Sequence, residues 1–318
     1  MRRNRRTPGG GSPDLARPRS FAARYGDGVG LSASLGGGGT FFVAWQLGYL
    51  EALARHDVHI AGADRLVGTS AGSIVAASLA HGNLHAMFLE SKVLLLAPGL
   101  LRVLLPADAT KPSQQAALDR YLHADDADLG TVLAIGRAAR EADTPSPKMI
   151  SRELLLVIGE YWGSSDLWMT TVDAHTGERC VLTAETEVSV ATAAAASSAV
   201  PGLFAPQPIA GRMCMDGGVS GTAVHLDLLA GARKALVLSL YRDEELTMGM
   251  LTLAPGDLTR ELDDLRASGT EIFFQAPEHH PMDIAGLMDP SAMPGAMAMG
   301  ARQAGEDVAT RGITEFWT

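Results

Sequence analysis

From about residue 28 the chain alternates between short apolar runs and longer segments whose apolar residues recur at helical spacing. The short runs have the length of buried strands, and the longer segments have the period of a helix. We predict strands at 29–35, 65–67, 167–172, 179–182, 213–215, 235–240 and 271–274, and helices at 40–55, 71–79, 188–198 and 258–267. Strands separated by such helices imply a three-layer α/β/α fold with a mainly parallel central sheet.

The middle of the chain departs from this alternation. Residues 83–160 have a mostly helical pattern that prolines interrupt. Within it, 93–106 is the most apolar stretch outside the predicted sheet, which suits either an interfacial lid or a broken helix packed on the core. The strands at 167–172 and 179–182 are joined by a turn that contains Asp173 and Gly177, so we expect a hairpin there.

The first twenty residues differ in composition from the rest. They contain six arginines and one aspartate around a Gly/Ser/Pro-rich middle, with almost nothing to bury. We therefore predict a disordered basic tail at 1–25 and a single domain at 26–318. The arginine pairs lack the apolar segment of an export signal. No run of eighteen apolar residues is present, so a transmembrane helix is not expected.

Charge and cysteine content narrow the possible partners. Removing the tail's net +5 from the formal charge of −10 leaves a body of about −15. Such a body argues against nucleic acid, which requires a concentrated basic surface. Cys180 and Cys214 form no metal-type cluster and no disulfide framework, which fits a reduced cytoplasmic setting, with one disulfide as the alternative. We predict no metal site and no cofactor.

The first candidate for chemistry is a G-x-S-x-G motif, Gly68-Thr69-Ser70-Ala71-Gly72. It stands between a predicted strand and a predicted helix, where a serine lies on a sharp turn with its hydroxyl presented at the sheet edge. Bulk at Gly68 or Gly72 would crowd that turn. The positive end of the following helix favours negative charge developing at Ser70. Taken alone, the motif equally suits a plain strand-to-helix turn.

Four consecutive glycines, Gly36, Gly37, Gly38 and Gly39, follow the first predicted strand. Such a loop lets the backbone approach a ligand closely and direct N–H groups at it, as an oxyanion hole requires. Glycine loops before helices also bind phosphates. That alternative fits less well because the loop has no G-x-G-x-x-G register and no following Walker lysine.

The third motif is Asp216-Gly217-Gly218, directly after the predicted strand at 213–215. An aspartate at the carboxyl end of a strand can face a catalytic crevice. Asp-Gly is also a common surface turn, and Asp216 considered singly favours that interpretation.

Together, the order and context of the three motifs resemble the patatin-like phospholipase family. The flanking segments 48–53, 66–67 and 198–204 match as well, and the resemblance spans about residues 28–275. The resemblance implies a serine acyl hydrolase that cleaves lipid esters, of phospholipase A, lysophospholipase or neutral ester lipase type. It places the nucleophile at Ser70, the base at Asp216 and the oxyanion hole in the glycine loop. It further implies a lipid or acyl-ester partner and a cytoplasmic protein with scope for peripheral membrane contact.

One position departs from the family pattern. Members usually carry an Arg or Lys shortly after the last loop glycine, whereas this chain has Phe41 and Phe42. The missing cation weakens the case for an anionic headgroup and favours neutral esters. It also leaves open a non-catalytic, lipid-binding or regulatory relative.

Four histidines offer rival chemistry. His279 or His280 would complete a Ser–Asp–His order, but both adjoin a proline in a polar stretch. His175 would suit a Ser–His acyltransferase, yet it falls in the predicted turn. His225 is near Asp216 in sequence, where a structural role is the commoner one. We therefore expect a Ser70–Asp216 dyad in which the carboxylate takes the serine proton.

Overall fold

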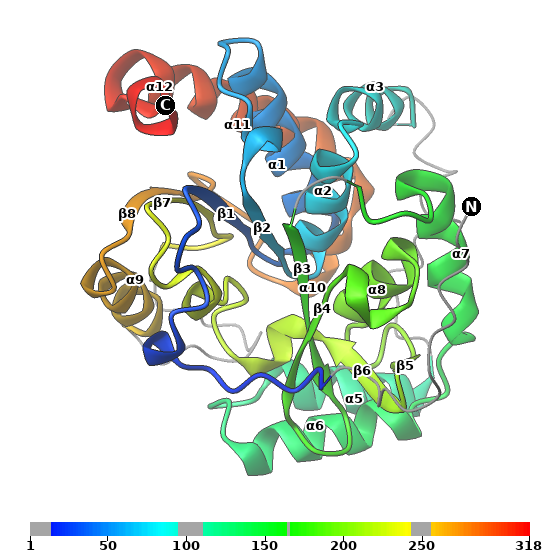
Figure 1. The fold of residues 1–318 in the computed structure, drawn as a ribbon. Coiled ribbons are helices and arrows are strands. Elements are labelled where there is room, and N and C mark those ends of the chain that lie inside the picture. The colour runs from blue at the N-terminus through cyan, green and yellow to red at the C-terminus, as the bar shows by residue number, and fades with distance from the viewer. Residues whose placement is uncertain (1–13, 95–110, 164–165, 243–255) are drawn as a thin grey trace, which may run out of the picture.

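The computed structural model describes residues 14–94, 111–163, 166–242 and 256–318, and within them eight strands form one mixed sheet (Figure 1). The strand order is β5-β6-β3-β2-β1-β7-β8, with β4 paired to β3. The strands are β1 (Leu31–Leu35), β2 (Arg65–Gly68), β3 (Asp166–Asp173), β4 (Arg179–Leu182), β5 (Gln207–Ile209), β6 (Arg212–Asp216), β7 (Lys234–Leu238) and β8 (Glu271–Gln275).

The sheet has a parallel part and an antiparallel part that share β3. Strands β3, β2, β1, β7 and β8 run parallel, whereas β4, β5 and β6 are joined by antiparallel pairings. The division arises because β3 is longer than β2. Met169 of β3 already pairs with Gly68, the last residue of β2, and the continuation of β3 through Asp173 pairs with β6.

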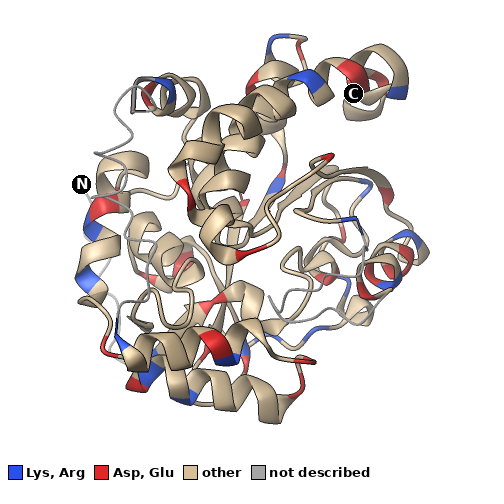
Figure 2. Cartoon of the chain, turned by 180° about the vertical axis from the view of Figure 1, so that it is seen from behind, with Lys and Arg blue, Asp and Glu red and all other residues tan. Residues whose placement is uncertain are grey.

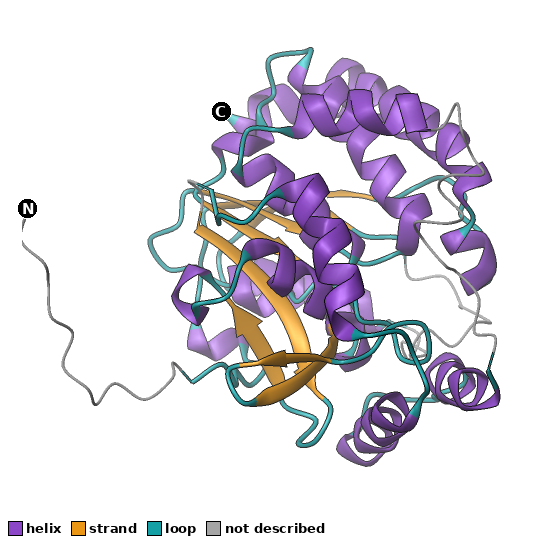
Figure 3. Cartoon of the chain, turned by 90° about the vertical axis from the view of Figure 1, so that its right-hand side faces the viewer, coloured by secondary structure: helices purple, strands orange, loops and turns teal. Residues whose placement is uncertain are grey.

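Helices lie on both sides of the strands, which confirms the predicted three-layer architecture (Figure 3). Side chains of β7 alternate between the two apolar layers: Leu236 and Leu238 join one cluster, and Ala235 and Val237 join the other. The longer helices are α1 (Gly39–Ala54), α2 (Ala71–Ala80), α3 (Leu84–Leu94), α5 (Pro112–Leu122), α6 (Leu129–Glu141), α7 (Pro147–Ile158), α8 (Val190–Ser197), α9 (Asp257–Ala267) and α11 (Met293–Glu306). Two short helices, α10 (Ile284–Met288) and α12 (Ile313–Trp317), lie in the C-terminal region.

Helix α1 is buried on nearly all sides, because it packs against α11, α2, α10 and α3. Two glycines permit this close crossing. A Cβ at Gly48 would overlap the backbone of Met297, and a Cβ at Gly300 would overlap the backbone of Trp45. The hydroxyl of Tyr49 on α1 donates a hydrogen bond to Asp307 (2.7 Å). The helix that follows the glycine loop is therefore firmly fixed.

Residues 14–25, which the composition assigned to a disordered tail, pack against the domain. Leu15 is buried, Ala16 forms a β-bridge with Cys180, and the Arg17 amide donates to the Arg179 carbonyl (2.9 Å). The prediction overlooked these contacts because backbone pairing requires no apolar side chains. Residues 1–13 lie outside the described residues, as does most of the apolar stretch at 93–106.

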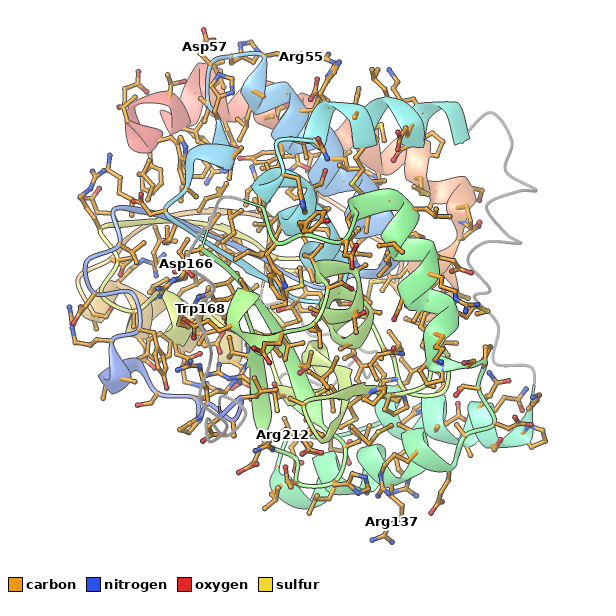
Figure 4. The ribbon with its side chains drawn as sticks, turned by 45° about the vertical axis from the view of Figure 1, so that its right-hand side comes forward. Arg55, Asp57, Arg137, Asp166, Trp168 and Arg212 are labelled. Carbon is orange, nitrogen blue, oxygen red and sulfur yellow. The ribbon has the colours of Figure 1, made fainter. Side chains whose placement is uncertain are left out.

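Ion pairs brace the two ends of β3, and the labelled side chains of Asp166, Trp168 and Arg212 mark their places in Figure 4. At the start of β3, Arg65 pairs with Asp166 (2.8 Å) and lies 4.0 Å from the ring centroid of Trp168. Near its end, Arg212 contacts Asp173 (3.0 Å).

The charged residues gather mainly on outer elements, whereas the centre of the molecule carries few (Figure 2). Helices α2 and α8, which lie around the Ser70 turn, contain no charged residue. In the part of the chain that the structure describes, no helix combines the length and apolarity needed to cross a membrane.

Candidate active site

Ser70 lies on a strained turn between β2 and α2. Its backbone has φ 51° and ψ −121°, a conformation that residues with a side chain rarely adopt and that costs about 1–3 kcal/mol. Two glycines make the turn possible. A Cβ at Gly68 would come within 2.6 Å of the Ser73 Cα, and a Cβ at Gly72 would overlap the Leu35 carbonyl. The G-x-S-x-G spacing is thus dictated by close backbone packing around the serine.

A second serine helps to fix this turn. The Ser70 amide donates a hydrogen bond to the Oγ of Ser197, at the end of α8 (2.9 Å). The Ser73 hydroxyl donates to the Ser70 carbonyl (2.6 Å). The sequence offered no signal for Ser197, which stands in a run of small residues with no motif of its own.

The glycine loop lies directly beside Ser70. A Cβ placed on Gly37 would lie 3.2 Å from the Ser70 Cβ. The Gly36 carbonyl accepts hydrogen bonds from Gln46 Nε2 (3.0 Å) and the Gly72 amide (3.1 Å). Because the connecting peptide is trans, this arrangement directs the Gly37 N–H to the opposite side. Gln46 is another residue that the motifs did not reveal.

The four loop glycines differ in the use of their amides. The Gly36 amide donates to the Leu238 carbonyl of β7 (2.9 Å), so it extends the sheet rather than the site. The amides of Gly37 and Gly38 donate to no residue that the structure describes. Gly39 has φ +65° and begins α1, whose first-turn N–H groups form the positive end of the helix. The amides of Gly37 and Gly38 are thus available as hydrogen-bond donors in the loop beside Ser70.

Asp216 ends β6 and is 2% exposed. Its Oδ1 accepts a hydrogen bond from the Gly218 amide (2.8 Å), while its Oδ2 is buried without a hydrogen-bond partner among the described residues. Burial raises the pKa of the Asp216 carboxyl to about 7, against the lowering effects of the Gly218 amide and the Ser70 hydroxyl. The Ser70 hydroxyl lowers the pKa of the Asp216 carboxyl and so lies near it, although no hydrogen bond of regular geometry joins the two.

Thr170 on β3 connects the two motifs. Its Oγ1 lies 2.7 Å from the Thr69 Oγ1, and a Cβ at Gly217 would come within 2.6 Å of the same oxygen. The Asp216 amide also donates to the Ala199 carbonyl after α8 (3.0 Å). The serine turn and the Asp216 loop thus rest on shared supports.

His225 lies behind the Asp216 loop. It is fully buried, and its Nε2 lies 3.1 Å from the Gly217 carbonyl. Since that carbonyl can only accept, Nε2 carries the proton and Nδ1 faces the guanidinium groups of Arg19 and Arg179, each at 3.4 Å. Burial and the two arginines hold the pKa of His225 well below its ordinary value. His225 therefore supports the loop as a neutral side chain.

The other candidate histidines lie elsewhere. His175 is exposed in the hairpin turn. His279 and His280 line a cavity of about 610 Å³ beside α1 and α11, and neither Ser70 nor Asp216 lines it. The described residues that line it are Phe41, His279, His280, Pro281, Ala292, Gly295, Ala296, Ala298, Met299 and Arg302. Among the described residues no group of three or more His, Cys, Asp or Glu side chains could hold a metal.

Comparison with known proteins identifies the family of the chain. The family model described as patatin-like phospholipase matches residues 33–228, more than half of the chain. No curated protein matches. Among solved structures, VipD from Legionella pneumophila is similar at 14% identity and a TM-score of 0.39, over 92% of this chain and 67% of that one. The type III effector protein ExoU is similar at 17% identity and a TM-score of 0.31, over 86% of this chain and 53% of that one. On the strength of the family model, the chain belongs to the patatin-like phospholipases.

Proposed function

We propose that this protein is a serine acyl hydrolase that cleaves carboxylic esters of lipids with Ser70 as nucleophile and Asp216 as base. One observation carries the proposal. A serine on a strained turn lies near a buried carboxyl whose pKa it affects, and a glycine loop with free amides adjoins the serine. These are the three parts that acyl transfer requires: nucleophile, base and oxyanion donors.

In the acylation step, the Ser70 Oγ attacks the ester carbonyl while Asp216 takes its proton. The amides of Gly37 and Gly38 stabilise the negative charge that develops on the carbonyl oxygen, to which one such donor contributes about 3–4 kcal/mol. Asp216 then returns the proton to the departing alcohol. In the second step a water attacks the acyl-Ser70 ester, with the same carboxylate as base.

The buried position of Asp216 explains how a dyad without imidazole can work. An ordinary aspartate has a pKa near 4 and is a poor base for a serine. Burial raises the pKa of Asp216 to about 7, into the range that favours general base catalysis near neutral pH. The positive end of α2 begins at the next residue after Ser70 and favours the developing alkoxide.

The surroundings of the glycine loop favour a neutral acyl ester over an anionic phospholipid. Phe41 and Phe42 stand on the first turn of α1 where a cation would attract a phosphate, and both are buried. The adjacent cavity has an apolar wall of alanine, methionine and Phe41 side chains. Its one arginine, Arg302, is paired with Glu278 (2.6 Å) and Glu306 (2.6 Å). We propose that the acyl chain extends into this cavity.

Labelling with a fluorophosphonate tests the nucleophile, since the probe reacts with activated serines. The wild-type protein is expected to label and Ser70→Ala to remain unlabelled. Ser197→Ala is the matched control, because Ser197 is buried nearby but accepts a hydrogen bond rather than attacking. Absence of labelling in the folded wild type would favour the non-catalytic, lipid-binding relative.

Substrate class is tested with p-nitrophenyl esters of graded chain length, a monoacylglycerol and an anionic phospholipid. We expect medium or long acyl chains and the neutral ester to be preferred. Preference for the anionic phospholipid would contradict the neutral-ester proposal while leaving the dyad intact. His175→Ala, His225→Ala and a His279→Ala/His280→Ala double variant should retain turnover, and a folded variant with none would favour a Ser–His mechanism.

A further inference from the structure

A tyrosine from a helix outside the three motifs reaches the Asp216 site. Tyr121, on α5, is 1% exposed. A Cβ placed on Gly218 would lie 3.4 Å from the Tyr121 hydroxyl and 3.1 Å from the Asp216 Oδ1. The phenol and the carboxylate therefore border the same small space, in front of the Gly218 backbone.

Helix α5 is held firmly in this position. Gln114, in its first turn, donates a hydrogen bond to the Gly202 carbonyl (3.2 Å). Gly202 has φ +86°, and a Cβ there would lie 2.9 Å from the Leu118 Cβ on α5. Gln114, Ala117 and Tyr121 form the buried face of the helix. Tyr121 is thus presented by a packed helix rather than by a loose loop.

The Tyr121 hydroxyl is neutral and has a hydrogen bond to offer. Burial, followed by the charges of Asp216 and Tyr241, raises the pKa of Tyr121 well above its ordinary value. Among the described residues the Asp216 Oδ2 receives no hydrogen bond, and Asp216 acts on the Tyr121 hydroxyl through its charge rather than through a hydrogen bond. The phenol can donate and the carboxylate can accept, so both can bind one small polar molecule that enters the space in front of Gly218.

A second phenol restricts which group in this cluster can ionise. Burial and the Asp216 charge raise the pKa of Tyr241 to about 12. Tyr241 is 5% exposed and its ring lies edge-on to His280, with 6.1 Å between centroids. Asp216 therefore carries the single negative charge of the cluster near neutral pH, and the phenols remain O–H donors.

We propose that Tyr121 positions the water that hydrolyses the acyl-enzyme, with its hydroxyl hydrogen-bonded to the water oxygen while Asp216 removes a water proton. This inference rests on the proposed function. The water oxygen forms a bond to the acyl carbon, and the bond from that carbon to the Ser70 Oγ breaks. The proton held by Asp216 passes to the Ser70 Oγ, which restores the enzyme and releases a carboxylic acid. The balance requires no other reactant.

The test separates acylation from deacylation in Tyr121→Phe, which removes only the hydroxyl. With a p-nitrophenyl ester, we expect one equivalent of p-nitrophenol to be released at the wild-type rate, followed by a steady state reduced about 10–100-fold. Intact-protein mass spectrometry should show the acyl group accumulating on Ser70. Hydroxylamine, which needs no proton removed by Asp216, should restore turnover.

Tyr49→Phe is the matched control, since Tyr49 is an equally buried tyrosine whose hydroxyl binds Asp307 far from the site in sequence. It should lower the melting temperature without changing the ratio of burst to steady state. If Tyr121→Phe lowers both phases equally or changes neither, the inference is overturned. Should that variant not fold, Tyr121→Met takes its place. A wild type without any Ser70-dependent turnover would instead refute the proposed function itself.

Discussion

The two halves of the sheet place the two proposed catalytic side chains by different means. In the parallel half, Ser70 follows β2 on a turn with positive φ, fixed by glycines on both sides. In the antiparallel half, Asp216 ends β6 in ordinary backbone geometry, and its special property is burial. In the proposed mechanism, local backbone strain and helix position activate the serine, and burial activates the aspartate.

Antiparallel pairing explains how the two ends meet. Strand β6 runs against β3, from Cys214 opposite Asp173 to Asp216 opposite Thr171, and so returns toward the end of β2. A parallel β6 would have carried its carboxyl end away from Ser70. The switch in strand direction at β3 therefore forms the site. We therefore expect substitutions at Asp216 to change activity through charge and burial. Substitutions at the serine turn should change activity through the steric effect of added atoms.

Asp216→Asn should give the largest effect, and it should change activity and stability in opposite directions. We expect turnover to fall by about 10³-fold or more because the base is lost. Between the ordinary carboxyl pKa near 4 and the folded value of about 7, the folded state holds a proton that the unfolded state releases, so stability falls as pH rises through this window. The raised pKa of Asp216 corresponds to a loss on the order of 4 kcal/mol in the free energy of unfolding at pH 8.

The uncharged Asp216→Asn variant should therefore be more stable than wild type at pH 8 in denaturant titrations. At pH 5, where Asp216 is protonated, the two proteins should differ little. Equal stability of the two proteins at both pH values would mean that other groups stabilise the buried Asp216 carboxylate. Burial would then give no reason for a raised pKa.

Gly37→Ala tests the steric effect of an added methyl group beside Ser70, without any change in charge. The added Cβ would lie 3.2 Å from the Ser70 Cβ, so one of the two must shift. We expect kcat to fall about 10²-fold, as for loss of one oxyanion donor, with little change in KM. Gly305→Ala on α11 is the control, because a Cβ there meets nothing within 4 Å. Wild-type kcat in Gly37→Ala would exclude this loop from the oxyanion hole.

The pH dependence of acylation tests the role of Asp216 as base in the wild-type protein. Asp216 must lose its proton to act as base, so kcat/KM should rise about tenfold per pH unit below 7 and level off above it. The plateau should extend past pH 9, because burial raises the pKa of Tyr241 to about 12. Rates of fluorophosphonate inactivation from pH 5 to 9 provide the measurement. If the rise in rate below pH 7 disappears in His225→Ala, the group that titrates is the histidine rather than Asp216.

The two halves also differ in how much the sequence revealed. The family, the three-layer fold and the α/β pattern could be predicted because apolar period and glycine spacing are local signals. Ser197 and Gln46, which hold the turn and the loop, could not be found, since each depends on a neighbour that only the fold supplies. The antiparallel hairpin of β3 and β4 was predicted from its turn residues, but the antiparallel pairing of β6 with β3 and β5 was not. The part of β3 beyond Met169 leaves room for β6 as a partner, and periodicity does not encode which strand pairs there or in which direction.

Thr170→Val should give the smallest effect and tests the link between the halves. It removes the hydroxyl that contacts Thr69 and adjoins Gly217, while keeping nearly the same volume. Loss of this hydrogen bond should cost about 1 kcal/mol of stability and reduce kcat several-fold, because both motifs lose a shared support. Thr171→Val on the same strand is the matched control, since its buried Oγ1 has no hydrogen-bond partner among the described residues. Its stability should be unchanged or slightly higher. If both variants behave alike, Thr170 contributes only packing, and the two halves are coupled through α8 and the Asp216 amide instead.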